Sequence, residues 1–279
     1  MMHDLEMNTD RGAGPFVTFR HLHLPDGHRI WLARNHRRGV GAVFAPRPFW
    51  QYRAFNGVMA VGFAIGSMLF AVGAALSLFP AFSGDLSSTE RDVNRIFFIG
   101  SLFFTLSAYL QVFQSANAGE KLVSKNAPSL RSYLGWRPKD PGWLSSSAQF
   151  AGTILFNLNT YDAFLGGGWL RQDVLIWVPD MLGSLLFLFS GYLAVVETCH
   201  DWWAWRPRTL AWWIVMVNFA GCVAFMASAL LAFVPPSGAS VNVIAVSTFF
   251  TLFGAMGFFL GALLAMYECI SKTDPTSRS

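Results

Sequence analysis

Long apolar runs constrain the fold of this chain more than any other feature of its sequence. Five runs are predominantly apolar and contain no Lys or Arg: Phe55–Phe79, Ile96–Ala116, Leu175–Val196, Leu210–Val234 and Val241–Tyr267. A helix needs about 20 such residues to cross the hydrocarbon core of a bilayer. Each run is therefore predicted to be a transmembrane helix. The charged share agrees, at 13% of the 279 residues against roughly 25% in soluble domains.

A sixth run, Ala148–Leu165, is less apolar because it contains Asn157, Asn159 and Asp162. The distribution of Lys and Arg nevertheless favours a sixth crossing, since basic residues accumulate in cytoplasmic loops. With six crossings, 17 of the 20 basic residues lie on one side of the membrane and 3 on the other. With five crossings the division is 14 to 6. We therefore expect six transmembrane helices with both termini in the cytoplasm of a bacterial-type inner membrane.

The segment before the first span is expected to carry a short β-hairpin. Residues 16–24 and 28–32 are rich in strand-forming residues and flank a turn at Pro25, Asp26 and Gly27. An isolated hairpin is marginal in water, so we expect it to pack on a loop, the membrane surface or a partner. Residues 34–53 are basic and polar and are expected to follow the inner headgroups. Residues 1–14 lack an apolar core and are not expected to be a secretory signal.

An internal repeat relates the even-numbered helices. The runs Gly100–Gln114, Gly183–Glu197 and Gly254–Glu268 align without gaps and share small residues on one helical stripe that ends in Gln or Glu. Small residues let helices approach closely in lipid. The odd-numbered helices align more weakly, in three triplets of matching residues: Trp50, Trp143 and Trp212; Asn56, Gln149 and Asn218; and Phe63, Phe156 and Phe225.

The predicted fold is therefore all-α and membrane-embedded, with six transmembrane helices in three repeated, parallel copies of an antiparallel hairpin. The expected divisions are a cytoplasmic segment, a hairpin, a basic loop, two further hairpins and a tail: 1–49, 50–119, 120–142, 143–200, 201–271 and 272–279.

The first hairpin resembles a known family. Asn56-Gly57, the run Gly62–Phe70 with Gly66-Ser67, and the run Phe98–Phe104 with Gly100-Ser101 are similar to the YrhK-like family of small two-helix membrane proteins. The resemblance is closest over residues 16–117, and it includes the preceding strand pair. The later hairpins resemble longer proteins that carry related hairpins. The resemblance implies a membrane fold, and it brings no activity, cofactor or catalytic residue with it.

Six polar residues form the candidate site, because all are expected near the cytoplasmic ends of the helices: Asn56, Gln114, Gln149, Glu197, Asn218 and Glu268. Antiparallel pairing within each hairpin predicts that Asn56 lies beside Gln114, Gln149 beside Glu197, and Asn218 beside Glu268. One interpretation is a site for a cation, a proton or a lipid headgroup, since ionisable groups in spans are functional candidates. The other is a set of interhelical hydrogen bonds, each contributing on the order of 0.6–2 kcal/mol.

Other chemistry is weakly supported by the sequence. Cys199, His200 and Cys269 fall at related positions, but their spacing does not force them together around a metal. The three histidines of the predicted hairpin, His21, His23 and His28, are more typical of a solvated basic surface. We find no grouping typical of nucleophilic, metal or phosphate chemistry, and no histidine at mid-depth for haem. No cofactor, metal or catalytic residue is predicted.

The sequence favours a non-catalytic structural or assembly protein that binds lipids or partners, including copies of itself, and does not bind nucleic acid. The alternative is a small channel or carrier that uses the Asn/Gln/Glu layer. A continuous wet path along the bundle axis favours the alternative, and a dry core filled with Phe counts against it. An intramembrane enzyme is a third class.

Overall fold

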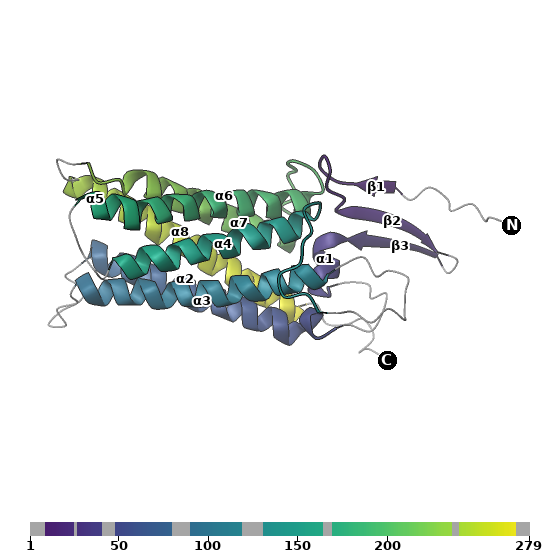
Figure 1. Cartoon of the computed structure of the whole chain (residues 1–279). Coiled ribbons are helices and arrows are strands. Elements are labelled where there is room, and N and C mark those ends of the chain that lie inside the picture. Colours follow the sequence, from purple (N-terminus) through teal and green to yellow (C-terminus); the bar gives the residue numbers. More distant parts are fainter. Residues whose placement is uncertain are drawn as a thin grey trace.

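The computed structural model describes residues 9–24, 27–40, 48–79, 90–118, 131–163, 169–235 and 240–271. Its elements are β1 (Thr9–Arg11), β2 (Phe19–Leu24), β3 (Gly27–Leu32), α1 (Ala33–Arg38), α2 (Arg53–Leu78), α3 (Glu90–Asn117), α4 (Pro141–Asp162), α5 (Trp169–Arg171), α6 (Val178–Cys199), α7 (Leu210–Leu231) and α8 (Val241–Ser271). A turn of 3-10 helix, Phe49–Gln51, precedes α2, and a π-helical segment, Gln172–Trp177, leads into α6. The long helices form one elongated bundle with the strands at one end, which we call the sheet end (Figure 1).

Five helical segments in the described residues are long and apolar enough to cross a membrane: Arg53–Leu78, Arg91–Asn117, Gln172–Cys199, Leu210–Leu231 and Val241–Ser271. They coincide with the five apolar runs of the sequence. The multi-pass membrane class is therefore confirmed, since helices satisfy their own backbone hydrogen bonds in lipid.

The sixth run also forms a helix of the bundle, α4, but it does not reach the hydropathy of the other five. It runs the length of its neighbour α3. At the sheet end, the Ser146 hydroxyl donates to the Ser115 hydroxyl at 3.0 Å, and at the far end, Asn94 Nδ2 donates to the Ala163 carbonyl at 3.1 Å. A 22-residue helix is about 33 Å long, which matches the hydrocarbon thickness of about 30 Å.

The polar residues of α4 explain its lower hydropathy, because they bond to both neighbouring helices. On the α3 side, Asn157 Nδ2 donates to Thr105 Oγ1 at 2.8 Å, and the Thr160 and Ser101 hydroxyls lie 3.2 Å apart. On the α6 side, the Ser145 hydroxyl donates to the Ser190 carbonyl at 2.9 Å. Side chains that bond inside the bundle lower the mean hydropathy of a helix without exposing polar groups to lipid.

The six long helices of the described residues pack as a closed ring. The order around the ring is α2, α3, α4, α6, α7 and α8, and α8 packs against α2 to close it. Consecutive long helices are antiparallel neighbours, as helices joined by short connections usually are. The contact between α8 and α2 is the only one of the six between helices that are not consecutive along the chain.

Three pairs of glycines bring neighbouring helices into backbone contact. An added Cβ at Gly66 would lie 3.0 Å from the Gly100 carbonyl oxygen, and an added Cβ at Gly100 would lie 3.1 Å from that of Gly66. The same reciprocal contact, at 3.0–3.2 Å, joins α4 to α6 and α7 to α8 through two further pairs: Gly152 with Gly183, and Gly221 with Gly254. Any larger residue at these six positions would force the helix axes apart.

A phenylalanine follows each of these glycines by four residues, and the six rings form the centre of the bundle: Phe70, Phe104, Phe156, Phe187, Phe225 and Phe258. Their exposure is 4–5%. Ring centroids lie 4.9 Å apart for Phe156 and Phe187, and 5.4 Å for Phe225 and Phe258. These separations are typical of favourable aromatic pairs. We call these six residues the Phe core.

The Phe core corrects one alignment made from the sequence. Phe63 was matched with Phe156 and Phe225, but Phe70 occupies the corresponding place, because its partner glycine is Gly66. The first odd-numbered helix is therefore displaced by seven residues relative to the expected alignment. Phe63 packs beside the core and is only partly buried.

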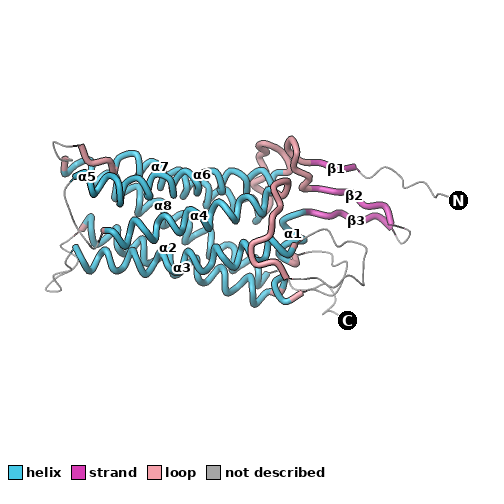
Figure 2. Tube along the Cα trace, viewed as in Figure 1, coloured by secondary structure: helices cyan, strands magenta, loops and turns pink. Residues whose placement is uncertain are grey.

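The N-terminal sheet has three antiparallel strands in the order β1-β2-β3, one more than predicted, and projects from the bundle (Figure 2). The predicted turn residues Pro25 and Asp26 lie outside the described residues, and Gly27 begins β3. The sheet is anchored beside the end of α6, where His200 Nδ1 lies 3.1 Å from the Thr18 hydroxyl. Packing on the bundle gives the sheet the support that an isolated hairpin lacks.

Substitution of Gly254 by Ala should destabilise the bundle. The new Cβ would lie 2.7 Å from Phe225 Cδ2 and 3.1 Å from the Gly221 carbonyl oxygen. Overpacking of this kind costs about 1–3 kcal/mol, so we expect a lower Tm by tryptophan fluorescence in detergent. Gly57→Ala is the matched control, because nothing lies within 4 Å of its added Cβ and Ala favours helix. Equal losses in both variants would contradict this packing.

Candidate functional site

The short helix α1 carries three arginines into the sheet end of the bundle. Arg34 and Arg37 are 6% and 8% exposed, and Arg34 and Arg38 lie one helical turn apart, on the same side of α1. Gly39, with φ 64°, ends the helix in the left-handed conformation that suits glycine. Residues 34–53 were expected to follow the membrane headgroups. For Arg34, Arg37 and Arg38 that expectation is wrong, because their guanidinium groups lie against carboxylates of the bundle.

Arg34 forms a bidentate ion pair with Glu268 at the end of α8. Arg34 Nη1 donates to Glu268 Oε1 at 2.9 Å, and Arg34 Nη2 donates to Glu268 Oε2 at 2.9 Å. Arg38 Nη2 also lies 3.3 Å from Glu268 Oε2. Planar forked pairing of this kind is the strongest geometry for an Arg–carboxylate contact. Two guanidinium groups therefore share one carboxylate.

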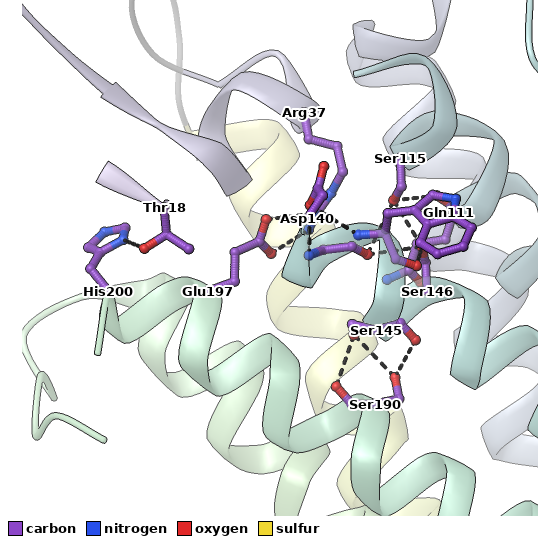
Figure 3. A network of polar contacts seen from close by, with 12 residues as sticks. Thr18, Arg37, Gln111, Ser115, Asp140, Ser145, Ser146, Ser190, Glu197 and His200 are labelled. Atoms are coloured by element: carbon purple, nitrogen blue, oxygen red, sulfur yellow. Dashed lines mark hydrogen bonds and ion pairs between the residues drawn. The ribbon is translucent and has the colours of Figure 1, made fainter. Parts of the chain in front are cut away.

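Arg37 forms the equivalent pair with Glu197 at the end of α6 (Figure 3). Its Nη1 and Nη2 donate to Glu197 Oε1 and Oε2 at 2.6 and 2.7 Å. The pair lies against Gly142, where an added Cβ would overlap the Arg37 guanidinium and lie 2.6 Å from Glu197 Oε1. Asp140 precedes Gly142 and caps α4, since its carboxylate accepts from the Gly142 and Trp143 backbone N–H groups at 2.9 and 3.1 Å.

Gln114 at the end of α3 takes the place that the two glutamates take on α6 and α8, without an ionic partner. Gln114 Nε2 donates to the Trp50 carbonyl at 2.5 Å and to Asn56 Oδ1 at 3.2 Å. Asn56 Nδ2 in turn donates to the Arg38 and Tyr52 carbonyls, both at 3.0 Å. The predicted proximity of Asn56 and Gln114 is thus found, and the pair fixes the backbone end of α1.

The other two predicted pairings are not formed. Glu197 lies against Gly142, seven residues and about two turns before Gln149 on α4. Asn218 donates from Nδ2 to the Ile214 carbonyl at 2.7 Å and packs against Gly261, about two turns before Glu268 on α8. The cause is the same error that misaligned Phe63. The first odd-numbered helix is displaced by seven residues, so Gln149 and Asn218 do not correspond to Asn56. Both amides instead face an internal cavity.

This cavity, of about 140 Å³, lies between the α1 arginines and the Phe core. Its polar lining comes from the three α1 arginines, one carboxylate, five amides and three hydroxyl residues of the helices: Glu197, Asn56, Gln111, Gln114, Gln149, Asn218, Ser145, Ser190 and Thr198. Its apolar lining includes Phe187 and Phe258 of the Phe core. A cavity near 150 Å³ accommodates a molecule the size of benzene, so this one has room for a small ligand.

Burial and neighbouring charges shift the pKa values of Arg37, Arg38 and Asp140. Burial lowers the pKa of Arg37, but the charge and hydrogen bonds of Glu197 and the charge of Asp140 outweigh it, and the net pKa is raised. Burial and then the charge of Arg34 lower the pKa of Arg38, which Glu268 offsets only in part. Burial and then the charge of Glu197 raise the pKa of Asp140. Arg37 is therefore well neutralised by its surroundings, and Arg38 is not.

The residues weighed for metal binding do not converge in the described part of the chain, where no group of three His, Cys, Asp or Glu side chains could hold an ion. The Cys199 thiol donates to the Ala204 carbonyl at 3.3 Å, and His200 contacts Thr18. The rings of His21 and His28 stack with centroids 5.5 Å apart. The side chain of His23 lies outside the described residues.

The α1 arginines are the site residues that the sequence interpretation missed. Their spacing at positions 34, 37 and 38 indicates one face of a helix, but that signal is equally typical of a helix on the membrane surface. Comparison with known protein families, with curated proteins and with solved structures finds no match for the chain.

The Arg37–Glu197 pair should be strongly coupled. Removing one partner of a buried pair costs about 3–5 kcal/mol, because the other charge is left buried, whereas replacing both can be nearly neutral. We expect Arg37→Met or Glu197→Met alone to lower the Tm markedly, and the double variant to recover most of the loss.

The exposed pair of Arg95 and Asp92, with side chains 62% and 46% exposed, provides the control for this double-mutant cycle. Arg95→Met should cost less than about 1 kcal/mol, as surface pairs do. Additive losses in the Arg37 and Glu197 variants would contradict a buried, neutralised pair.

Proposed function

We propose that this multi-pass membrane protein is non-catalytic and binds a ligand or partner at its sheet end without conducting solutes across the membrane. The observation that carries the proposal is the position of the 140 Å³ cavity, which has polar groups toward α1 and the Phe core on its other side. A cavity with a closed apolar wall across the bundle axis suits binding from one side.

The bonding of the two glutamates supports a non-catalytic role. A general acid or base must reach the proton that it transfers in the substrate, and a cation site needs available carboxylate oxygens. Both oxygens of Glu197 and of Glu268 accept from arginine. The Asn/Gln/Glu layer is thus better suited to holding α1 on the bundle than to coordinating a cation.

We propose the following membrane arrangement. Six helices cross the inner membrane of a bacterial-type cell, with α4 as the third, and both termini are cytoplasmic. The length of α4 and the charge asymmetry support this arrangement. The six helices are three parallel copies of one hairpin, which the repeated Gly-x-x-x-Phe contacts support, and the chain is related to the YrhK-like family through the same motif.

A channel or carrier remains the second candidate function, favoured by the amides and hydroxyls of the cavity lining. A transport path would have to pass the Phe core, whose rings are 4–5% exposed. The burial of these rings supports the Phe core as a barrier and counts against a channel.

Flux measurements separate the two candidates. Under an imposed gradient, proteoliposomes with the purified protein should show no more K⁺, Cl⁻ or H⁺ flux than protein-free vesicles. An added ionophore is the positive control and should dissipate each gradient. Phe225→Ala combined with Phe258→Ala should increase leakage if the Phe core is the barrier. Robust flux through the wild-type protein would overturn the binding proposal in favour of the carrier.

Single-cysteine labelling tests the crossing by α4. In a variant with all three native cysteines replaced by Ser, a cysteine at Lys139 should react with a membrane-impermeant maleimide only in inside-out vesicles. The variant Asp162→Cys should react only in right-side-out vesicles, because Lys139 lies just before the start of α4 and Asp162 is its last residue. Labelling of both from the same side would contradict the sixth crossing.

A further inference from the structure

The three guanidinium groups of α1 are unequally paired. Glu197 and Glu268 are the carboxylates in direct contact with them, and the charge of the nearby Asp140 acts on Arg37. Arg34 and Arg37 each hold one carboxylate in bidentate fashion. Within the described part of the chain, the one carboxylate contact of Arg38 is the 3.3 Å approach to an oxygen that Arg34 already uses. The Arg38 side chain is 16% exposed. A buried cation without a full counter-charge is costly, and an anion nearby would relieve that cost.

Arg38, the least fully paired of the three, lies on the wall of the 140 Å³ cavity together with Arg34 and Arg37. Among the cavity-lining residues that the structure describes, Glu197 is the only carboxylate, and Arg37 occupies both of its oxygens. The remaining polar lining consists of amides and hydroxyls, which can all donate hydrogen bonds. The polar side of the cavity is therefore rich in donors and positive in charge.

The side of the cavity toward the Phe core carries its aromatic lining. Phe63, Phe187 and Phe258 line it together with Cys222, and the amides Gln149 and Asn218 lie at its edge. An inorganic anion would leave this wall without contacts. A molecule with a charged group at one end and a compact apolar body at the other would contact both walls and gain from burial of its apolar surface.

We propose that the cavity binds a small organic monocarboxylate, with its carboxylate at Arg38 and its compact apolar body against the Phe core. This inference rests on the one-sided binding proposed above and names the chemical class of the ligand. The lowered pKa of Arg38 is consistent with it, because an anion beside this guanidinium supplies the counter-charge that burial demands.

Benzoate is a suitable probe, since its ring matches the size of molecule that such a cavity accommodates. With purified protein in nanodiscs at constant ionic strength, we expect benzoate to raise the Tm saturably and to give a binding isotherm by calorimetry. Neutral benzamide and inorganic chloride should each bind at least tenfold more weakly. Equal binding of benzamide would overturn the role of charge, and equal binding of chloride would overturn the role of the apolar body.

Two variants locate the probe. Arg38→Gln should weaken benzoate binding at least tenfold, while Arg95→Gln, the exposed control, should leave it unchanged. Ala265→Leu places additional side-chain volume at the cavity lining without removing a charge. It should also abolish the benzoate shift, which keeps the test decisive if Arg38→Gln fails to fold. Unchanged binding in Ala265→Leu would overturn the assignment to this cavity.

The outcomes for the ligand and for the general function are distinguishable. If benzoate does not bind the wild-type protein and the proteoliposomes show no flux, the monocarboxylate proposal is overturned and the one-sided binding role stands. If the proteoliposomes conduct, the binding role itself fails, whatever benzoate does.

Discussion

Backbone contact between helices at glycine is the interaction on which the rest of this bundle depends. Lipid offers little hydrophobic drive for helices to associate, so close packing and polar contacts must hold them together. At Gly66–Gly100, and at the two equivalent pairs, a Cβ added to either glycine would lie 3.0–3.2 Å from the carbonyl oxygen of the other. These contacts set the distance between axes in each hairpin. They also fix the register that turns the following phenylalanines toward a common centre.

The Phe core divides the interior of the ring into two regions with different chemistry. Toward the far end, the interhelical contacts are made by hydroxyls and amides, such as Thr160 with Ser101. Toward the sheet end, the interior contains the cavity and the ion pairs of the α1 arginines with Glu197 and Glu268. The guanidinium groups of α1 neutralise the carboxylates of α6 and α8 and tie the sheet to residues that lie 160 and 234 positions away in sequence. The cost of burying these ions is offset by their bidentate geometry.

The Phe core and the ion pairs of α1 together indicate which class of ligand the cavity suits. A carboxylate layer at a membrane interface is a natural candidate for cation binding. Here arginine occupies the carboxylates, and the described lining of the cavity beside them contains three guanidinium groups and one carboxylate. The sign of the site is thereby reversed, from one that attracts cations to one that attracts anions. The ligand class proposed for the cavity follows from that reversal and from the apolar wall that the Phe core supplies.

The sequence by itself determined the membrane class and five of the helices, because hydropathy over about 20 residues is a local property. Charge asymmetry also pointed to α4, whose polar residues serve contacts with α3 and α6. Only the tertiary structure decided the roles of Arg34, Arg37 and Arg38, since a basic helix acquires its meaning from the carboxylates it meets. The tertiary structure also decided that Phe70 rather than Phe63 joins the core, because the glycine contacts set the register of the helices. It decided as well that α8 closes the ring on α2, because no local signal encodes that contact.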